Sequence, residues 1–112
     1  MKKINGNLTA QIQIKTGTTK NEIGEVVPQW QTVNTLTGFL DYQSGDSKYA
    51  AYDAKIQDST HVFIGDYIIL DSRIKAENSR LTANGRIYDI MLIDDPMELH
   101  KHLEIYLKYT GD

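Results

Sequence analysis

Two histidines near the end of the sequence are the first residues whose spacing could do chemistry. His100 and His102 are two positions apart, so on a β-strand both imidazoles would lie on one face, a geometry that can hold a metal ion. No third ligand follows at a suitable spacing, and the neighbours Lys101 and Glu104 are charged. The pattern favours a solvated strand face over a metal site. His61, which opens another apolar segment, is expected at the surface.

Three carboxylates precede these histidines. Asp94, Asp95 and Glu98 could divide the roles of acid and base if a buried pocket separated their pKa values. They surround Pro96, however, where a short helix would begin, and carboxylates stabilise the free N–H groups at a helix start. We therefore expect Asp95 to cap a helical turn and Glu98 to complete a capping box.

No signature of an enzyme accompanies these residues. The chain has no cysteine, which excludes disulfides, zinc ribbons and thiol catalysis. The Gly-Thr-Thr-Lys run at Gly17 to Lys20 lacks the upstream glycine of a phosphate-binding P-loop, and no nucleophile elbow is present. The sequence predicts a protein that is not an enzyme, with no catalytic residues, no metal and no cofactor.

A group of tyrosines and lysines could stack on nucleic-acid bases. Tyr42, Tyr49 and Tyr52 lie close in the sequence to Lys48 and Lys55, as in a single-strand binding platform. The surrounding segment is neutral, and the whole chain has a net charge of −3, whereas a nucleic-acid-binding surface is usually basic. The pattern favours a surface loop.

The composition bounds the class of protein. The chain has 112 residues, of which 40% are hydrophobic and 24% charged, and this predicts one globular domain spanning residues 1–112. No apolar run approaches the roughly 20 residues of a membrane span, and none follows Lys2 and Lys3 as in a secretory signal. We expect a soluble protein made inside the cell.

Short apolar segments separated by polar turns predict a mainly β protein. Apolar and polar residues alternate over residues 8–14, as in a half-buried strand. The run 16–24 is rich in Thr, Gly and Lys and indicates an exposed turn or loop. Pro28 fits only an edge or a strand entry. Residues 30–42 favour extended chain, in which Gly38 would mark a bulge or a sharp bend.

The second half continues the β pattern. Strand character returns at residues 60–65 and 67–70. The polar run 75–85 ends in Asn-Gly, which suits a tight hairpin turn. Apolar side chains on both faces of residues 86–94 indicate a central strand that is covered on each side.

The C-terminal segment leaves two structures open. An apolar residue at every second position from 103 to 109 favours one helical turn at 96–100 followed by a strand from about 102 to 109. A longer helix is the alternative, because Leu99, Leu103, Tyr106 and Leu107 would share one face. Together the segments predict five or six short strands in an antiparallel barrel or sandwich, with at most a short helix.

One long segment cannot contribute to a core. Residues 43–55 contain no Val, Ile, Leu, Phe, Met or Trp. A loop beyond about 12–15 residues in a small domain is usually functional or disordered. We therefore expect a protruding loop at about residues 43–57.

An ordered set of short motifs resembles the head-closure, or stopper, proteins of long-tailed bacteriophages and prophages, within the head–tail joining (connector) family. The motifs are "QWQTV" around Trp30, "TGFLD" at 37–41, "THVFIGDY" from Thr60, the Asn-Gly-Arg-x-Tyr-Asp-Ile pattern at 84–90 and the closing "IDDPMELHKHLEIYLK". They cover about residues 5 to 110. The resemblance implies a small antiparallel β-barrel with a structural role in the virion.

The resemblance also implies how such a protein works. Members form a ring, dodecameric in the usual case, below the portal and adaptor at the virion neck, after synthesis in the host cytoplasm. The ring closes the DNA exit channel after packaging and offers an attachment surface for the tail. The implied partners are the head-completion adaptor, a tail-completion or tail-terminator protein and, without sequence specificity, the double-stranded DNA in the channel. No membrane is implied, and the isolated chain would be a monomer or a weak oligomer.

A long loop between early strands projects into the channel in these proteins, and in this chain it falls on residues 43–57. The candidate channel-gating or inter-subunit residues are Ser44, Gly45, Asp46, Ser47, Lys48, Tyr49, Ala50, Ala51, Tyr52, Asp53, Ala54 and Lys55. Two alternatives remain open: a tail-completion or tail-terminator protein, and a nucleic-acid-binding module on a barrel of the oligonucleotide-binding type.

Deleting residues 44–54 is expected to leave the fold stable, because these residues add nothing to the core, while particles built with the shortened protein lose packaged DNA. Circular dichroism and urea unfolding check the first part, and DNA retention in phage particles checks the second. A deletion that unfolds the protein would make the segment part of the core.

Overall fold

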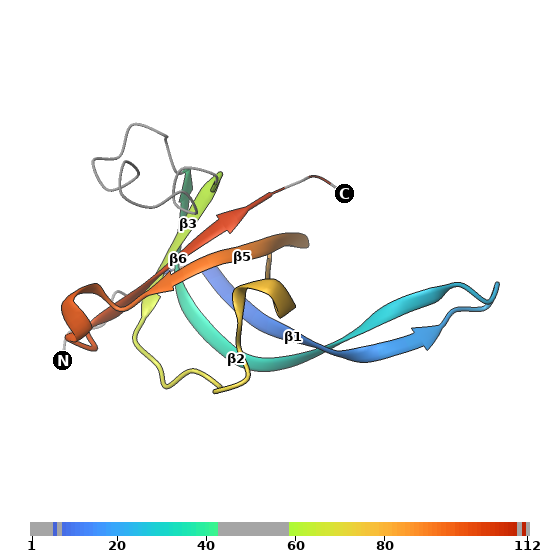
Figure 1. Ribbon diagram of the computed structural model, residues 1–112. Coiled ribbons are helices and arrows are strands. Elements are labelled where there is room, and N and C mark those ends of the chain that lie inside the picture. The colour runs from blue at the N-terminus through green and yellow to red at the C-terminus, as the bar shows by residue number, and fades with distance from the viewer. Residues whose placement is uncertain (1–5, 7, 43–58, 110, 112) are drawn as a thin grey trace.

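The computed structural model describes residues 6, 8–42, 59–109 and 111 of the chain. The predicted loop at 43–57, with its candidate gating residues, lies outside the described residues. The described part contains six β-strands and two single-turn 3-10 helices (Figure 1). The strands are β1 (Leu8–Lys20), β2 (Val26–Tyr42), β3 (His61–Asp66), β4 (Ser79–Ala83), β5 (Arg86–Asp94) and β6 (His102–Lys108), and the helices are η1 (Ala76–Asn78) and η2 (Pro96–Glu98).

The six strands form one closed antiparallel barrel. Their order is β1-β2-β3-β6-β5-β4, and β4 pairs back with β1 to complete the ring of strands. The pairings β3–β6 and β1–β4 join segments that are far apart in the sequence. The prediction of a mainly β protein built as a small antiparallel barrel is confirmed.

The barrel interior is filled by alternate side chains of the strands, as a closed sheet requires. The largest side chains that are almost completely buried are Tyr88, Phe63, Ile12, Leu81, Leu103, Ile105 and Leu107. On β5, Tyr88 and Ile90 face this core, whereas Ile87 on the other face is 45% exposed. The expectation that this strand is covered on both faces is wrong, because the described elements form a single closed layer.

A smaller apolar cluster lies on the outer surface of β3, β5 and β6. Val62 and Tyr106 form its buried centre, and Ile64, Met91 and Leu92 pack against them. Val62 and Tyr106 are cross-strand partners, and Tyr106 also faces Leu92 on β5. We call these five residues the outer cluster. They explain the apolar outer positions of β5 that the sequence pattern attributed to a second layer.

β1 and β2 extend beyond the barrel as a two-stranded ribbon (Figure 1). The pairing of β1 with β4 ends at Ile14, whereas its pairing with β2 continues as far as Lys20. Every side chain of β1 beyond Ile14 is exposed. We call residues 15–31 the hairpin arm. The prediction of a turn or loop over 16–24 is therefore wrong for 16–20. A ribbon that is exposed to solvent on both faces has no alternation of apolar and polar residues from which a strand could be predicted.

Asn21 fixes the turn at the tip of the hairpin arm. Its Oδ1 accepts hydrogen bonds from the backbone N–H groups of Ile23 (3.1 Å) and Glu25 (3.0 Å). Gly24 adopts a φ of 84°, and its N–H donates to the carbonyl of Asn21 at 3.0 Å. These local bonds hold the tip in one conformation while Ile23 and Val26 remain 79% and 66% exposed.

Two segments between β3 and β5 differ from their sequence predictions. Residues 67–70 are irregular rather than a strand. The polar run 75–85 contains η1 and β4, and Leu81 of β4 is completely buried in the core. The predicted hairpin turn is confirmed, because Asn84 and Gly85 join β4 to β5 with φ values of 53° and 75°.

The C-terminal segment forms η2 followed by β6, as the alternation predicted, so the longer helix is wrong. Asp95 precedes η2 without capping it through its side chain, and the predicted capping box is absent. Its carboxylate instead accepts a hydrogen bond from the backbone N–H of His100 at 3.0 Å and contacts the Nδ1 of that residue. The physical reason is that Met97 and Glu98 adopt φ values of 56° and 55°, so no regular helix start aligns its N–H groups there.

β1, β2 and β3 approach one another closely at Gly38. This residue pairs with Leu8 on one side and with Gly65 on the other. A Cβ atom on Gly38 would lie 2.1 Å from the carbonyl oxygen of Ile64. The register shifts between β1 and β2 occur elsewhere along these strands, so of the bulge or sharp bend expected at Gly38 the bulge is wrong. The position requires glycine because three backbones meet there.

Gly38→Ala is expected to destabilise the fold by about 2 kcal/mol, because the obstructing atoms belong to the backbone and cannot turn aside. Gly65→Ala is the matched control, since its Cβ would meet the side chains of Phe63 and Leu36. Urea unfolding followed by circular dichroism measures both variants. Equal losses of stability would contradict the assigned role of Gly38.

Candidate functional site

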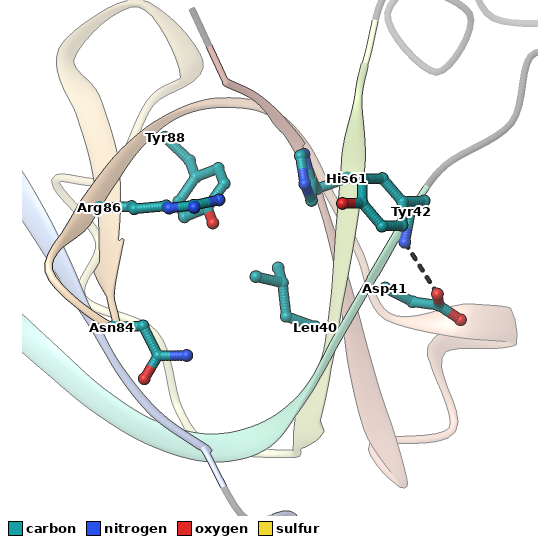
Figure 2. Close-up of a pocket in the computed structure, with 7 residues that line it drawn as sticks. All are labelled: Leu40, Asp41, Tyr42, His61, Asn84, Arg86 and Tyr88. Atoms are coloured by element: carbon teal, nitrogen blue, oxygen red, sulfur yellow. Dashed lines mark hydrogen bonds between the residues drawn. The ribbon is translucent and has the colours of Figure 1, made fainter. Parts of the chain in front are cut away.

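One end of the barrel opens into a pocket. The chain leaves the described part at Tyr42, the last residue of β2, and returns at Ser59, shortly before β3. Tyr42 and His61 are cross-strand partners at this end. A pocket of about 430 Å³ lies here, and we call it the mouth pocket (Figure 2). Its lining residues are Leu40, Asp41, Tyr42, His61, Asn84, Arg86 and Tyr88.

The mouth pocket has two sides. Arg86 and Tyr88 come from β5 and Asn84 from the turn before it, while the other lining residues come from β2 and β3. The Arg86 guanidinium and the Tyr88 hydroxyl point into the space between the two sides, and Leu40 projects toward them from β2 (Figure 2). The tight Asn84-Gly85 turn therefore places an amide and a guanidinium at the rim of the barrel.

His61 is a buried part of this pocket, so its predicted surface position is wrong. His61 is only 9% exposed. On β3 it lies two residues before Phe63, so its side chain is on the same face of the strand as Phe63, which faces the core. The imidazole centroid lies 4.9 Å from the ring of Tyr42, 5.2 Å from Tyr88 and 6.3 Å from Tyr109. An aromatic surround of this kind accommodates a neutral imidazole well.

Hydrogen bonds hold the Nδ1 side of the His61 ring in place. The backbone N–H of Tyr109 donates to Thr60 Oγ1 at 2.8 Å, and the same hydroxyl lies 2.8 Å from the Nδ1 of His61. The hydroxyl has one proton and two lone pairs, so it pairs with Nδ1 in either tautomer of the neutral ring. These bonds fix the orientation of the imidazole in the pocket.

Burial lowers the pKa of His61 below its ordinary value of 6.5, and the positive charge of Arg86 lowers it further. The guanidinium carbon of Arg86 lies 5.4 Å from the ring centre of Tyr109. Within the described ranges, Arg86 forms no ion pair. Among the described lining residues, the mouth pocket therefore contains a guanidinium that is not paired with the one carboxylate present, that of Asp41.

A second group of polar side chains braces the root of the hairpin arm. The Arg80 guanidinium lies 4.1 Å above the ring of Trp30, and its Nε donates to Gln13 Oε1 at 2.8 Å. The Nε2 of Gln13 in turn donates to Thr32 Oγ1 at 3.2 Å. Burial lowers the pKa of Arg80. These contacts join β4 of the barrel to both strands of the arm, so they fix the direction in which the arm leaves.

The residues that the sequence singled out at the C-terminal end do not come together as a site. His100 lies in the turn before β6, with its ring 4.7 Å from that of Tyr67, whereas His102 lies on β6 and contacts Glu104 (3.1 Å). Across residues 6, 8–42, 59–109 and 111, no group of His, Asp and Glu could hold a metal ion.

Asp94 belongs to an acidic group at the same end. Burial raises the pKa of its carboxyl, and the nearby charges of Glu104 and Asp95 raise it further. Asp94 and Glu104 are cross-strand partners, where like charges destabilise a sheet. The repulsion between these carboxylates destabilises the barrel. The arrangement does not divide the roles of acid and base between them.

Sequence reasoning missed the residues that line the mouth pocket. The Asn-Gly-Arg-x-Tyr pattern contained a signal for three of them, because the hairpin turn at Asn84-Gly85 fixes the positions of Arg86 and Tyr88. The opposite side could not be found in the same way, since it depends on the pairing of β2 with β3.

No helix in the described part is long and apolar enough to cross a membrane.

A small closed antiparallel β-barrel with a projecting two-stranded arm is the class of protein that this fold defines. The family model described as phage head completion protein matches residues 1–108. The chain therefore belongs to the phage head completion protein family, and the resemblance seen in the sequence motifs is confirmed.

The comparison with solved structures agrees at the level of the fold. The solution structure of protein SF1141 from Shigella flexneri 2a matches with a TM-score of 0.62 over 100% of this chain and 99% of that chain. The sequence identity is 21%, so this likeness shows the fold alone. No curated protein matches the chain.

The lowered pKa of His61 predicts a pH-dependent stability. The unfolded chain binds a proton at this residue more readily than the folded chain, so the contribution of neutral His61 is complete above pH 6.5 and is lost as the pH falls through the lower folded pKa. Urea unfolding of the wild type should therefore show a larger loss of stability between pH 7.5 and pH 5.5 than His61→Gln. His100 and His102 are present in both proteins and cancel in the comparison. Parallel losses would contradict the buried neutral state.

Proposed function

We propose that this protein forms a ring below the portal and adaptor of a phage neck, where it closes the DNA exit channel after packaging and receives the tail. Membership of the phage head completion protein family is the observation that carries the proposal. The resemblance to head-closure proteins implies that the ring is dodecameric. It also implies the place at the virion neck, between the adaptor and the tail. The role is structural and needs no catalytic step.

The outer surface of the barrel supports an assembly role. Around the buried centre of the outer cluster, the partly buried Ile64, Met91 and Leu92 lie on the outside of β3 and β5. Phe39 on the neighbouring β2 is 44% exposed. Apolar patches on the surface of a small protein commonly mark protein contacts. A ring repeats one such contact around a closed symmetry, so a modest interface in each subunit gives a stable whole.

We assign the channel-closing role to residues 43–57, as the resemblance to head-closure proteins implied. The described residues on either side support this assignment, because Tyr42 and His61 are adjacent partners on β2 and β3. The described residues that flank the segment on its two sides thus lie at the barrel mouth. Such a placement suits a segment whose contacts are made with neighbouring subunits or with DNA.

A deletion of the gene tests the proposal against its nearest rival. Electron microscopy of the resulting particles is expected to show heads that package DNA, then leak it and carry no tails. Intact, full heads joined to tails of abnormal length would instead assign the protein to tail termination. Particles complemented with the wild-type gene serve as the control.

The isolated chain is expected to be a monomer that joins a ring only on the adaptor, because a single subunit contact is weak without ring closure. Light scattering of the chain alone and together with adaptor rings measures this. A stable dimer without affinity for neck components would overturn the proposal. A salt-dependent affinity for single-stranded nucleic acid, weakened by Tyr49→Ala or Tyr52→Ala, would favour the nucleic-acid-binding module instead.

A further inference from the structure

Among the described residues, hydrogen-bonding groups gather in the mouth pocket around a cation that no carboxylate pairs with. Arg86 contributes a guanidinium with no ion pair in the described part of the chain, Asn84 an amide, Tyr88 a hydroxyl and His61 an imidazole. The one carboxylate of the lining, that of Asp41, accepts a bond from the backbone N–H of Tyr42 at 2.8 Å and points away from Arg86 (Figure 2).

We propose that the mouth pocket binds a carboxylate that a peptide segment of a partner protein inserts between its two sides. Arg86 has the planar geometry to pair with both oxygens of a carboxylate, and the Tyr88 hydroxyl points toward the same space. Leu40 and the ring of Tyr42, which is 81% exposed, offer apolar contact to the residue that carries the acid. That the partner is a neck component rests on the proposed function, whereas the chemistry of the pocket does not.

The shape and charge of the pocket favour a peptide over DNA. A duplex is bound through many phosphates, and this requires a row of cations. Among the described residues that line it, the mouth pocket has one strong cation, that of Arg86, together with aromatic walls. The chain as a whole has a net charge of −3. A single acidic side chain or a chain terminus can enter where a duplex backbone cannot.

Binding of an acid should be coupled to the protonation of His61. An anion beside the imidazole favours its charged form, so by linkage the acid binds more tightly as the pH falls. The charged and titratable groups around the imidazole come from β2, β5 and the chain after β6. They are Asp41, Tyr42, Arg86, Tyr88 and Tyr109. Of these and His61, only the imidazole titrates ordinarily near neutral pH.

Three small probes test the pocket in the full chain by NMR. N-acetylphenylalanine carries a terminal carboxylate, N-acetylglutamyl-phenylalaninamide carries a side-chain carboxylate, and N-acetylphenylalaninamide carries neither. At least one acid is expected to shift the amide signals of Tyr42, His61, Arg86 and Tyr88, with the affinity at least about tenfold above that of the neutral amide. Which acid binds more tightly identifies the source of the carboxylate. The bound acid should also raise the pKa of the His61 imidazole, which can be read directly in the wild type.

Arg86→Gln should weaken the binding of the acid about tenfold, because one charge-assisted pair is lost. Lys20→Gln removes the same charge from the distant hairpin arm and should leave the affinity unchanged. Equal binding of the acids and the neutral amide, or an Arg86→Gln variant that binds normally, would overturn the proposal. So would a DNA duplex that shifts the same signals while neither acid does. None of these results depends on ring formation, so the proposed function stands or falls separately.

Discussion

Closure of the barrel depends on the close approach of three backbones at Gly38. β1 and β3 both pair with β2 at this residue, and a single methyl group would overlap the Ile64 carbonyl. A sheet of six strands must bend sharply to close, and a residue without a side chain allows that bend where the strands are most crowded. The same β2–β3 ladder continues from Gly38 to the pairing of Tyr42 with His61 at the mouth pocket.

The hairpin arm and the mouth pocket are stabilised in different ways. The residues of the mouth pocket lie on strands that also line the core, so the geometry of that site is tied to the stability of the barrel. The arm is held by the side chain of Asn21 at its tip and by Arg80, Trp30 and Gln13 at its root. An isolated two-stranded ribbon is only marginally stable in water, which explains why such bracing is needed.

Much of the fold followed from local patterns. The alternation around Ile12 on β1 and around Ile105 on β6 predicted strands with the correct inner face, and the Asn84-Gly85 pair predicted the correct turn, because each signal is contained within a few residues. The predicted surface position of His61 and the predicted loop over residues 16–20 were wrong for a common reason. The burial of His61 is set by the pairing of β3 with β2 and β6, and the course of residues 16–20 by a ribbon exposed on both faces, and neither leaves a periodic signal in the sequence.

The hairpin arm has a consequence for how such proteins diverge. Ile23 and Val26 at its tip take no part in the core, and substitutions at exposed positions usually change the free energy of unfolding little. The arm and the barrel core are therefore under different constraints. The sequence of the arm tip can change while the barrel keeps the packing of its core.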